Sequence, residues 1–382
     1  MGGGISMRSA EERFPKSSMH IHFVNENIGG HETMHVHLRA ALAGEPDIEA
    51  SFFHTPGRGL AERVLGVSIP GLGRLDLDLH SLRSQLARSA VVRRHLSRLE
   101  PWPDALHMYT HNAALLSVGH IRRTPTVVSL DATNRQNAYR LPEREPTLFT
   151  PATVAAVVPL ERRVYRAARR IVTHSRWAAD SVLSYGVAAE KVEVIPFGIT
   201  VPAKGTAVRD DGPPRIVFVG SSMERKGGWR LVRMWKRWLA DSSRLTLVTR
   251  EQVAPDPAIE VRNDIRPGDG KLEALLAESD IFAMPGEIDS FGYALLEAMA
   301  AELPVVAPRQ AAVPEIVVDG VTGIVVPLGD DAGFADGLMR LLRDRDARRE
   351  MGEAARRRVL ERFDARITTA LLLEVIRDAA GD

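Results

Sequence analysis

The stretch RIVFVGSSMERKGGWRLVRMW (residues 215–235) decides the fold class of this chain. It begins with an apolar run that has the length of a buried strand, and a short polar loop follows. Leu231 and Trp235 then recur at helical spacing. A strand, a loop and a helix in this order form the repeating unit of a parallel α/β sheet.

The same alternation extends over most of the chain. We predict ten buried strands, at 19–24, 105–109, 126–130, 170–173, 192–195, 215–219, 245–248, 280–284, 304–307 and 323–326. We predict helices that include 31–43, 81–99, 175–185, 229–240, 292–301 and 331–344. Strands that alternate with helices imply right-handed crossovers, and hence doubly wound parallel sheets.

The length of 382 residues favours two domains. A segment rich in proline, glycine and charge, 199–214, precedes the strand at 215 and marks the boundary. We predict a disordered tail (1–18), an N-terminal doubly wound domain (19–198), a linker (199–214), a C-terminal doubly wound domain (215–363) and a final helix (364–382). Ligands of such sheets bind at the carboxyl ends of the strands, so the cleft between the two domains is the expected site.

Composition excludes several classes of protein. A net charge of +1 gives no general attraction to nucleic acid, and the absence of cysteine excludes disulfides and thiolate metal sites. The first 18 residues lack a signal-peptide core, and the apolar segment 151–160 is too short to span a bilayer. We therefore expect a cytoplasmic protein.

Two segments carry chemistry in the second half of the chain. Arg225 and Lys226 stand just before a helix, where free backbone N–H groups and two cations suit a diphosphate; a solvated basic turn is the alternative. In MPGEIDSFGYALLEAMAAELPVVAP (284–308), Asp289 lies in a loop and Glu297 in the helix that follows. Two such carboxylates can accept hydrogen bonds from sugar and ribose hydroxyls.

The pattern DSFGYALLEAMA (289–300) resembles the donor-site signature of the retaining GT-B glycosyltransferases of family four. Three further segments resemble the same family in the same order: the VG…RKG loop, HSRWAADSVLSYGVAAEKVEVIPFGI (174–199) and VPEIVVDGVTGIVVPLGD (313–330). The resemblance implies an α/β GT-B fold of two Rossmann-like domains that face each other across a cleft.

The resemblance also implies an activity and its residues. A hexose-type sugar would pass from a UDP-, GDP- or ADP-sugar to a hydroxyl of a glycan, lipid or small molecule, with retention, and with no metal or other cofactor. The implied catalytic residues are Asp131, Lys226 and Asp289. The implied donor-binding residues are Gly29, Gly30, Ser221, Arg225, Lys226, Ser290, Phe291, Gly292, Glu297 and Glu315. The implied acceptor-binding residues are His31 and Asp131.

Four positions depart from the family pattern: Asp131 stands where many members have histidine, Phe197 where asparagine is usual, Ser221 where arginine is frequent, and Ala311-Ala312 where glycines are usual. Asp131 can bind a hydroxyl, or it can mark a changed donor preference or a loss of activity. A non-catalytic sugar-nucleotide binder therefore stays open as an alternative.

Two metal motifs compete with this interpretation. His31-Glu32-Thr33-Met34-His35 has the H-E-x-x-H spacing of a zinc hydrolase, but the glycines before it and the absence of a third ligand argue against zinc. Asp76 and Asp78 have D-x-D spacing, which we interpret as exposed acids on a strand or loop edge. We expect no metal site.

Two basic segments, 81–99 and 161–170, lie in the first half of the chain. In the second, Arg162, Arg166, Arg169 and Arg170 share one predicted helix face. Such a face can attract anionic lipids at the inner membrane surface, and a solvated helix face is the alternative.

Overall fold

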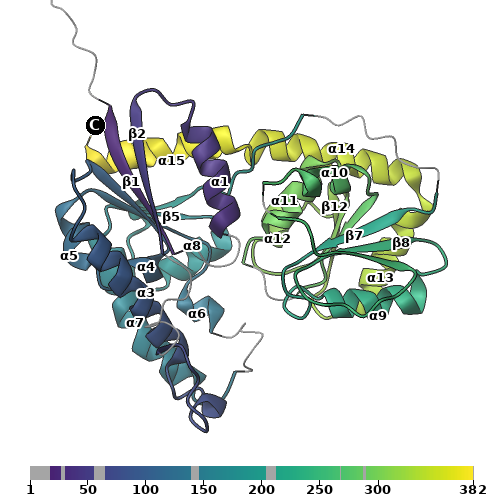
Figure 1. The fold of residues 1–382 in the computed structure, drawn as a ribbon, viewed down its shortest axis with the longest axis horizontal. Helices are drawn as coiled ribbons and strands as arrows, with labels where there is room; N and C mark the ends of the chain where they lie inside the picture. The colour runs from purple at the N-terminus through teal and green to yellow at the C-terminus, as the bar shows by residue number, and fades with distance from the viewer. Residues whose placement is uncertain are drawn as a thin grey trace, which may run out of the picture.

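The computed structural model describes residues 18–26, 31–55, 65–138, 146–203, 212–266, 268–286 and 290–381. These residues form two lobes, each a six-stranded parallel sheet between layers of helices (Figure 1). The predicted fold class, two doubly wound α/β domains, is confirmed.

The N-terminal lobe has the strand order β2-β1-β3-β4-β5-β6. Its strands are β1 (Met19–Asn25), β2 (Ile48–His54), β3 (Ala105–Tyr109), β4 (Thr126–Leu130), β5 (Arg170–Thr173) and β6 (Val192–Val194). Its helices are α1 (His31–Leu42), α3 (His80–Leu96), α4 (His111–Ala114), α5 (Val118–Arg123), α6 (Asn134–Asn137), α7 (Thr150–Ala167) and α8 (Arg176–Leu183), with 3₁₀ turns η1 (Gly73–Leu75) and η2 (Ala189–Lys191).

The C-terminal lobe has the strand order β12-β11-β10-β7-β8-β9. Its strands are β7 (Arg215–Val219), β8 (Arg244–Val248), β9 (Ile259–Arg262), β10 (Ile281–Ala283), β11 (Val305–Pro308) and β12 (Gly323–Val326). Its helices are α9 (Gly228–Trp238), α10 (Lys271–Ala277), α11 (Tyr293–Ala300), α12 (Val313–Ile316), α13 (Asp331–Arg343) and α14 (Arg345–Arg362), and the last helix is α15 (Ala365–Ala380).

All ten predicted strands are present, but sequence reasoning missed β2 and β9. Both are edge strands, paired on one side with β1 and β8 respectively. An edge strand in these sheets is only partly buried, so its sequence lacks the continuous apolar run of a central strand. Each of them also contains an acid, Glu49 in β2 and Glu260 in β9, which interrupts the apolar run that predicts a strand.

The strand order reverses direction at one point in each sheet. In the C-terminal lobe this point lies between β7 and β10, and in the N-terminal lobe between β1 and β3. The loops that leave the two strands at such a point diverge to opposite faces, and the crevice between them is where ligands of α/β sheets bind. Glu26 and Thr110, which follow β1 and β3, line the same cavity as Gly220 and Ser290, which come after β7 and β10.

Two chain segments join the lobes side by side. Ile199 accepts a hydrogen bond from Ala365 N at 2.9 Å, and its own N–H donates to Phe363 O at 2.8 Å. Gly198 is required here, since a Cβ would lie 2.6 Å from Ala365 Cα and closer still to Thr368. α15 then packs on α1 and across β3, β4 and β5 of the N-terminal lobe (Figure 1).

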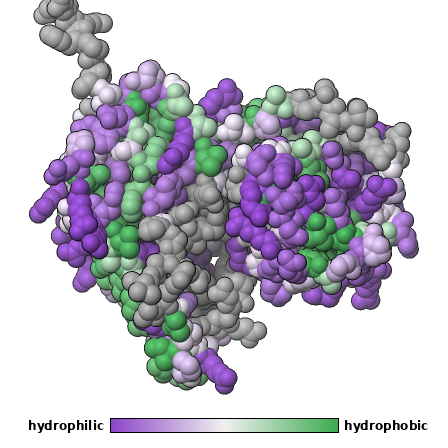
Figure 2. Space-filling view, in the orientation of Figure 1, coloured by the Kyte–Doolittle hydropathy of each residue, from purple (hydrophilic) through white to green (hydrophobic). Residues whose placement is uncertain are grey.

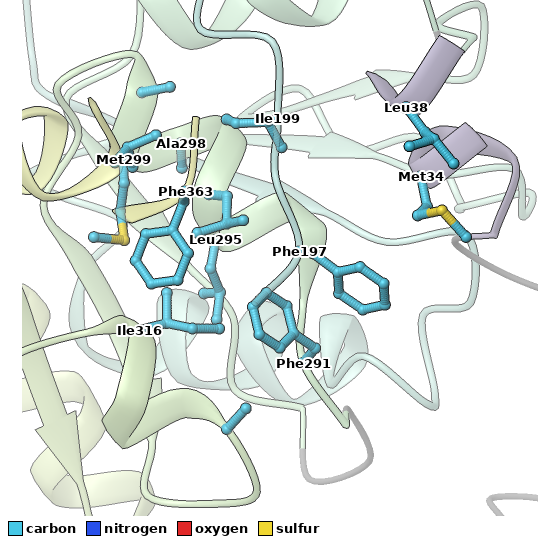
Figure 3. Close-up of a cluster of buried hydrophobic side chains, with 14 of the residues drawn as sticks. Met34, Leu38, Phe197, Ile199, Phe291, Leu295, Ala298, Met299, Ile316 and Phe363 are labelled. Atoms are coloured by element: carbon cyan, nitrogen blue, oxygen red, sulfur yellow. The ribbon is translucent and has the colours of Figure 1, made fainter. Parts of the chain in front are cut away.

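One cluster of buried apolar side chains continues from lobe to lobe. Phe197 lies between Met34 and Leu38 of the N-terminal lobe and Phe291 of the C-terminal lobe (Figure 3). Its ring is 4.9 Å from that of Phe291, edge to face, and 3.7 Å from that of His174, stacked. The phenylalanine at the family's usual asparagine position therefore packs the junction of the lobes.

Two sequence predictions are wrong in detail. α7 ends at Ala167, so Arg169 and Arg170 are not on its basic face, and Arg170 pairs with Asp378 of α15 at 2.5 Å. Asp78 is not an exposed acid on a strand: it is buried and accepts hydrogen bonds from Ser68 and from the backbone of Ile69. Among the described helices, none is at once long and apolar enough to traverse a bilayer.

Candidate functional site

A cleft of about 1180 Å³ lies between the lobes and is lined by both. The predicted site residues that line it are Asp131, Ser221, Arg225, Lys226, Ser290, Phe291, Gly292 and Glu297. They come from the loops after β4 and β7, from the segment between β10 and α11, and from α11 itself. Residues up to 166 positions apart in the chain therefore meet at one cavity, which is the arrangement a ligand site between two such sheets requires.

Backbone contact fixes the basic loop before α9. Gly227 has φ +75° and caps α9, and a Cβ on it would lie 2.8 Å from the backbone of Pro285 and Gly286. A Cβ on Gly286 would in turn lie 2.7 Å from the backbone of Lys226. The two glycines thus let the loops after β7 and β10 touch, and this contact sets Lys226 at the cleft wall.

The opening of α11 places backbone and carboxylate groups on the same wall. Gly292 caps the helix with φ +95°, a conformation that favours glycine, and the backbone N–H groups at the start of α11 point toward this wall, with that of Leu295 bonded to Gly292 O. Glu297 follows on α11 and lines the cleft. Burial, and then repulsion from Glu273, raises the pKa of Glu297 to about 7.

Asp131 is held against the opposite lobe. It follows β4 directly, and its Oδ2 accepts a hydrogen bond from Ser290 Oγ at 2.5 Å. Ser290 O accepts a bond from Ala312 N, which ties this loop to the rest of the C-terminal lobe. The residue at the family's usual histidine position therefore lies in the cleft and also joins the two lobes across it.

Several predicted residues lie outside the described part of the chain. Gly29, Gly30 and Asp289 are among them, and so is the side chain of His31, whose backbone begins α1. Their assigned roles therefore stay predictions.

Glu315 has a different environment from the one predicted. It is not among the residues that line the cleft. Its carboxylate accepts hydrogen bonds from the backbone N–H groups of Arg176, at 2.8 Å, and Trp177, at 3.0 Å, at the start of α8. Both oxygens are thus engaged by the N-terminal lobe, so Glu315 joins the lobes behind the cleft instead of contacting a donor within it.

Of the H-E-x-x-H segment, the side chains of Thr33, Met34 and His35 are described. His35 is 2% exposed and packs edge-on against the rings of Phe52 and His54, next to buried Met34 and Leu38. In the part of the chain that the structure describes, no three His, Asp or Glu side chains are grouped as metal ligands. His35 therefore belongs to the helix–sheet core.

Sequence reasoning missed two polar groups of the cleft, on His37 and Tyr293. His37 Nδ1 accepts the backbone N–H of Thr200 at 3.0 Å, so the proton of the neutral ring is assigned to Nε2. Burial lowers the pKa of His37 to about 4, so the ring is neutral near pH 7. His37 Nε2 and Tyr293 Oη are both buried and without a hydrogen-bond partner among the described residues. Their rings stack 6.2 Å apart. No local signal reveals this pair, because it forms only when α1 and α11 meet.

A row of amides lines the N-terminal side of the cleft. Gln85 Nε2 donates to Asn134 Oδ1 at 2.6 Å, and Asn134 Nδ2 donates to Asn112 Oδ1 at 2.9 Å. Behind them, buried Glu161 accepts from Asn134 N and pairs with His111 at 2.9 Å. Burial acts to raise the pKa of Glu161, but hydrogen bonding and charge from His111 outweigh it and hold the pKa below its usual value. This network fixes the amides in place.

The cleft extends beside β8 and α10 to Thr249, Arg250, Ile265, Arg266 and Leu272. Ile265, Arg266 and Gly268 of this part come from the segment between β9 and α10. It lies on the C-terminal lobe together with Lys226 and Glu297. A single extended ligand can therefore contact all three regions.

Comparison with known families matches both lobes. Residues 29–198 match the family described as "Glycosyl transferase 4-like domain", and residues 213–344 match "Glycosyl transferases group 1".

Individual glycosyltransferases also match this chain in sequence. The chain is 30% identical over 303 residues to the phosphatidyl-myo-inositol mannosyltransferase of Mycobacterium leprae, covering 72% of this chain and 74% of that protein. It is 26% identical over 348 residues to the D-inositol 3-phosphate glycosyltransferase of Pseudarthrobacter chlorophenolicus, covering 84% and 80%. A shorter match to the N-acetyl-alpha-D-glucosaminyl L-malate synthase of Bacillus anthracis, 44% identical over 89 residues, spans 23% of each chain.

Solved structures share the fold. Sucrose-phosphate synthase from Thermosynechococcus elongatus superposes with a TM-score of 0.72 at 15% identity, covering 94% of this chain and 98% of that one. Anabaena Alr3699/HepE in complex with UDP-glucose superposes with a TM-score of 0.65 at 16% identity, covering 94% and 100%. Both likenesses concern the two-lobed architecture.

Proposed function

Because this chain belongs to the group 1 glycosyltransferases of GT-B fold, we propose that it transfers a hexose-type sugar from a nucleoside diphosphate sugar to an acceptor hydroxyl, with retention of anomeric configuration and without a metal. One observation carries the proposal: Lys226, Glu297 and Asp131 line a single cleft between the lobes. A cationic loop, a carboxylate on a helix and a carboxylate from the facing lobe are the groups that an activated sugar needs.

The donor would lie along the C-terminal wall. Arg225 and Lys226 would neutralise the diphosphate, and the free N–H groups at the start of α11 would add to this field. Glu297 would hold the ribose, and the base would lie by Ile265 and Arg266. The neighbour from Anabaena, solved with UDP-glucose, supports a nucleotide sugar as donor. The panel of UDP-, GDP- and ADP-sugars described below tests which base, uracil, guanine or adenine, the site accepts.

The proposed reaction is a substitution on one face of the sugar. The bond from the anomeric carbon to the diphosphate oxygen breaks, and a bond to the acceptor oxygen forms on the same face. The acceptor proton passes to the departing diphosphate, so no protein nucleophile is required. Lys226 and Arg225 stabilise the negative charge that develops on the leaving group, which is the task a metal performs in other enzymes.

The acceptor would enter from the N-terminal side. Asp131 would accept a hydrogen bond from a hydroxyl of the sugar or the acceptor, and His37 Nε2 and Tyr293 Oη offer further polar partners. The amides of Gln85, Asn112 and Asn134 can both donate and accept. Such a lining suits an acceptor that carries several hydroxyl groups. We propose the cytoplasm as the location, because a chain without cysteine has no disulfides that would need an oxidising compartment.

A second candidate function is a sugar-nucleotide binder without turnover. The position of Asp131 favours it, because a carboxylate bonded to Ser290 replaces the family's usual histidine at the cleft. Both candidates bind nucleotide, so only turnover separates them.

The test is turnover of a panel of UDP-, GDP- and ADP-sugars in the presence of EDTA. We expect one donor to be hydrolysed slowly without acceptor and to glycosylate a hydroxylated acceptor with the donor's anomeric configuration, as read by NMR. A donor at a hundred times its Kd should also stabilise the protein by about 2.7 kcal/mol. Tight binding with no turnover of any donor would leave only the binder, and inversion or a strict metal requirement would contradict the mechanism.

The raised pKa of Glu297 predicts how nucleotide binding depends on pH. An ionised carboxylate accepts two ribose O–H bonds and a protonated one does not, so affinity for the free nucleotide should rise as pH increases through about 7. The stability of the unliganded protein depends on pH in the opposite direction. Because the folded pKa lies above the usual 4.5, the stability that Glu297 contributes at low pH is lost as pH rises from 4.5 through 7.

Calorimetric titration of nucleotide between about pH 5.5 and about pH 8.5, roughly 1.5 units either side of the pKa of Glu297, measures this effect. Glu297→Gln should flatten the profile. Glu273→Gln removes the repelling neighbour, so its midpoint should move to lower pH. A profile that both variants leave unchanged would show that Glu297 does not bind the ribose.

A further inference from the structure

α3 and α7 carry a projecting end beyond the N-terminal sheet, at the lowest part of the molecule in Figure 1. We define the apolar tip as residues 65–77 and 146–149. It holds eight of the twenty large apolar side chains that are exposed in the described part of the chain. Six of them lie between Leu65 and Leu77, and Leu148 and Phe149 are the others, with exposed fractions from 38% to 89%. This concentration separates the tip from scattered surface leucines, which are normal.

Hydrogen bonds hold the tip in this form. Thr147 Oγ1 donates to Leu75 O at 2.8 Å, which joins the two segments, and Thr153 Oγ1 of α7 donates to Asp76 O at 2.5 Å. Buried Asp78 accepts from Ser68 Oγ at 3.0 Å and from Ile69 N at 3.1 Å. The backbone is therefore tied down while the apolar side chains face outward.

Charge is distributed in two zones. Among the residues of the tip only Arg74 and Asp76 are charged, and Figure 2 shows hydrophobic side chains at this end of the molecule. Further along α7 the exposed charged side chains are Arg162, Arg163 and Arg166, all cations. An apolar end followed by a cationic zone matches a bilayer, where acyl chains lie beneath anionic headgroups.

The tip also borders the cleft. Asp76 of the tip lines the cavity, and so do Thr153 of α7, which donates to the Asp76 carbonyl, and Val154 in the next position. A surface that docks here would therefore meet the N-terminal mouth of the cleft.

We propose that the apolar tip docks this protein on an anionic lipid bilayer, with the tip among the acyl chains and the arginines of α7 toward the headgroups. A projecting end with few charges can insert into a bilayer, whereas a protein partner of standard size needs a broad face of about 800 Å². Docking presents a membrane-borne acceptor to the cleft, and this last step rests on the proposed function. The docking itself does not.

Vesicle flotation with the full chain and no donor tests the proposal. The probes are vesicles of phosphatidylcholine alone and of phosphatidylcholine with phosphatidylglycerol. The wild type should bind the mixed vesicles. Leu72→Ser/Leu75→Ser/Leu148→Ser should weaken partition by at least about tenfold, since each leucine loses its transfer into the apolar phase. Arg162→Gln/Arg163→Gln/Arg166→Gln should abolish the preference for phosphatidylglycerol.

The control is Val321→Ser/Leu328→Ser/Leu371→Ser, which changes three exposed apolar side chains away from the tip. It should bind vesicles as the wild type does. No binding by the wild type, or equal loss in the control, overturns the proposal. So does light scattering that shows the tip variant changing an oligomer to a monomer, because the tip would then be a contact between copies of this chain.

Circular dichroism and thermal unfolding establish that each variant is folded. Donor hydrolysis separates the two proposals. Lost vesicle binding with hydrolysis intact would leave the proposed function standing, and absent hydrolysis with vesicle binding intact would remove the proposed function alone.

Discussion

Lys226→Ala should lower kcat/KM for the donor by roughly 100- to 1,000-fold, because one cation that stabilises the departing diphosphate is removed from a cleft of limited solvent access. The close approach of Gly227 and Gly286 fixes the backbone of this loop, and with it the backbone of Lys226, at the cleft wall. Donor hydrolysis without acceptor should fall by a similar factor, because the same bond to the diphosphate breaks. Initial rates at varied donor concentration measure both.

Lys236→Ala is the matched control. Lys236 lies on α9, is more than half exposed, and pairs with Asp256 at 2.5 Å outside the cleft. We expect activity close to that of the wild type. Lys226→Arg, which keeps the charge, should recover part of the loss. If Lys226→Ala and Lys236→Ala retain equal activity, Lys226 is not the group that stabilises the leaving diphosphate.

Asp131→Asn should lower kcat by at least about 100-fold with little change in nucleotide affinity. The amide keeps the shape of the carboxylate but removes its charge and one acceptor position at the facing wall of the cleft. Nucleotide affinity should persist because the nucleotide is proposed to contact the C-terminal lobe. Single-turnover rates and calorimetric Kd values for the nucleoside diphosphate separate the two quantities.

Ser290→Ala distinguishes substrate binding by Asp131 from a purely structural role. It removes the 2.5 Å hydrogen bond between the lobes and leaves the carboxylate in place. If Asp131 binds substrate, the serine variant should lose only about tenfold, the scale of one hydrogen bond. Equal losses in Ser290→Ala and Asp131→Asn would instead show that Asp131 acts by holding the lobes together.

The sequence by itself determined ten of the twelve strands in the described residues, the fold class and the family. The reason is that a central strand of a parallel sheet is buried on both faces, so its sequence is a continuous apolar run, as in 215–219. The loop with Lys226 and the helix with Glu297 are equally local, because each needs only the residues on either side of it. These features could be predicted without coordinates.

Only the tertiary structure decided how distant segments meet. The bond between Asp131 and Ser290 joins residues 159 positions apart, and Glu315 turned away from the cleft because the start of α8 supplies two N–H groups to it. His37 and Tyr293 become cleft residues only where α1 meets α11. The exposure of the apolar tip was also decided by tertiary structure, because the sequence does not show whether another element covers a given leucine. Periodicity reports which face of an element is apolar, and packing between elements decides what that face touches.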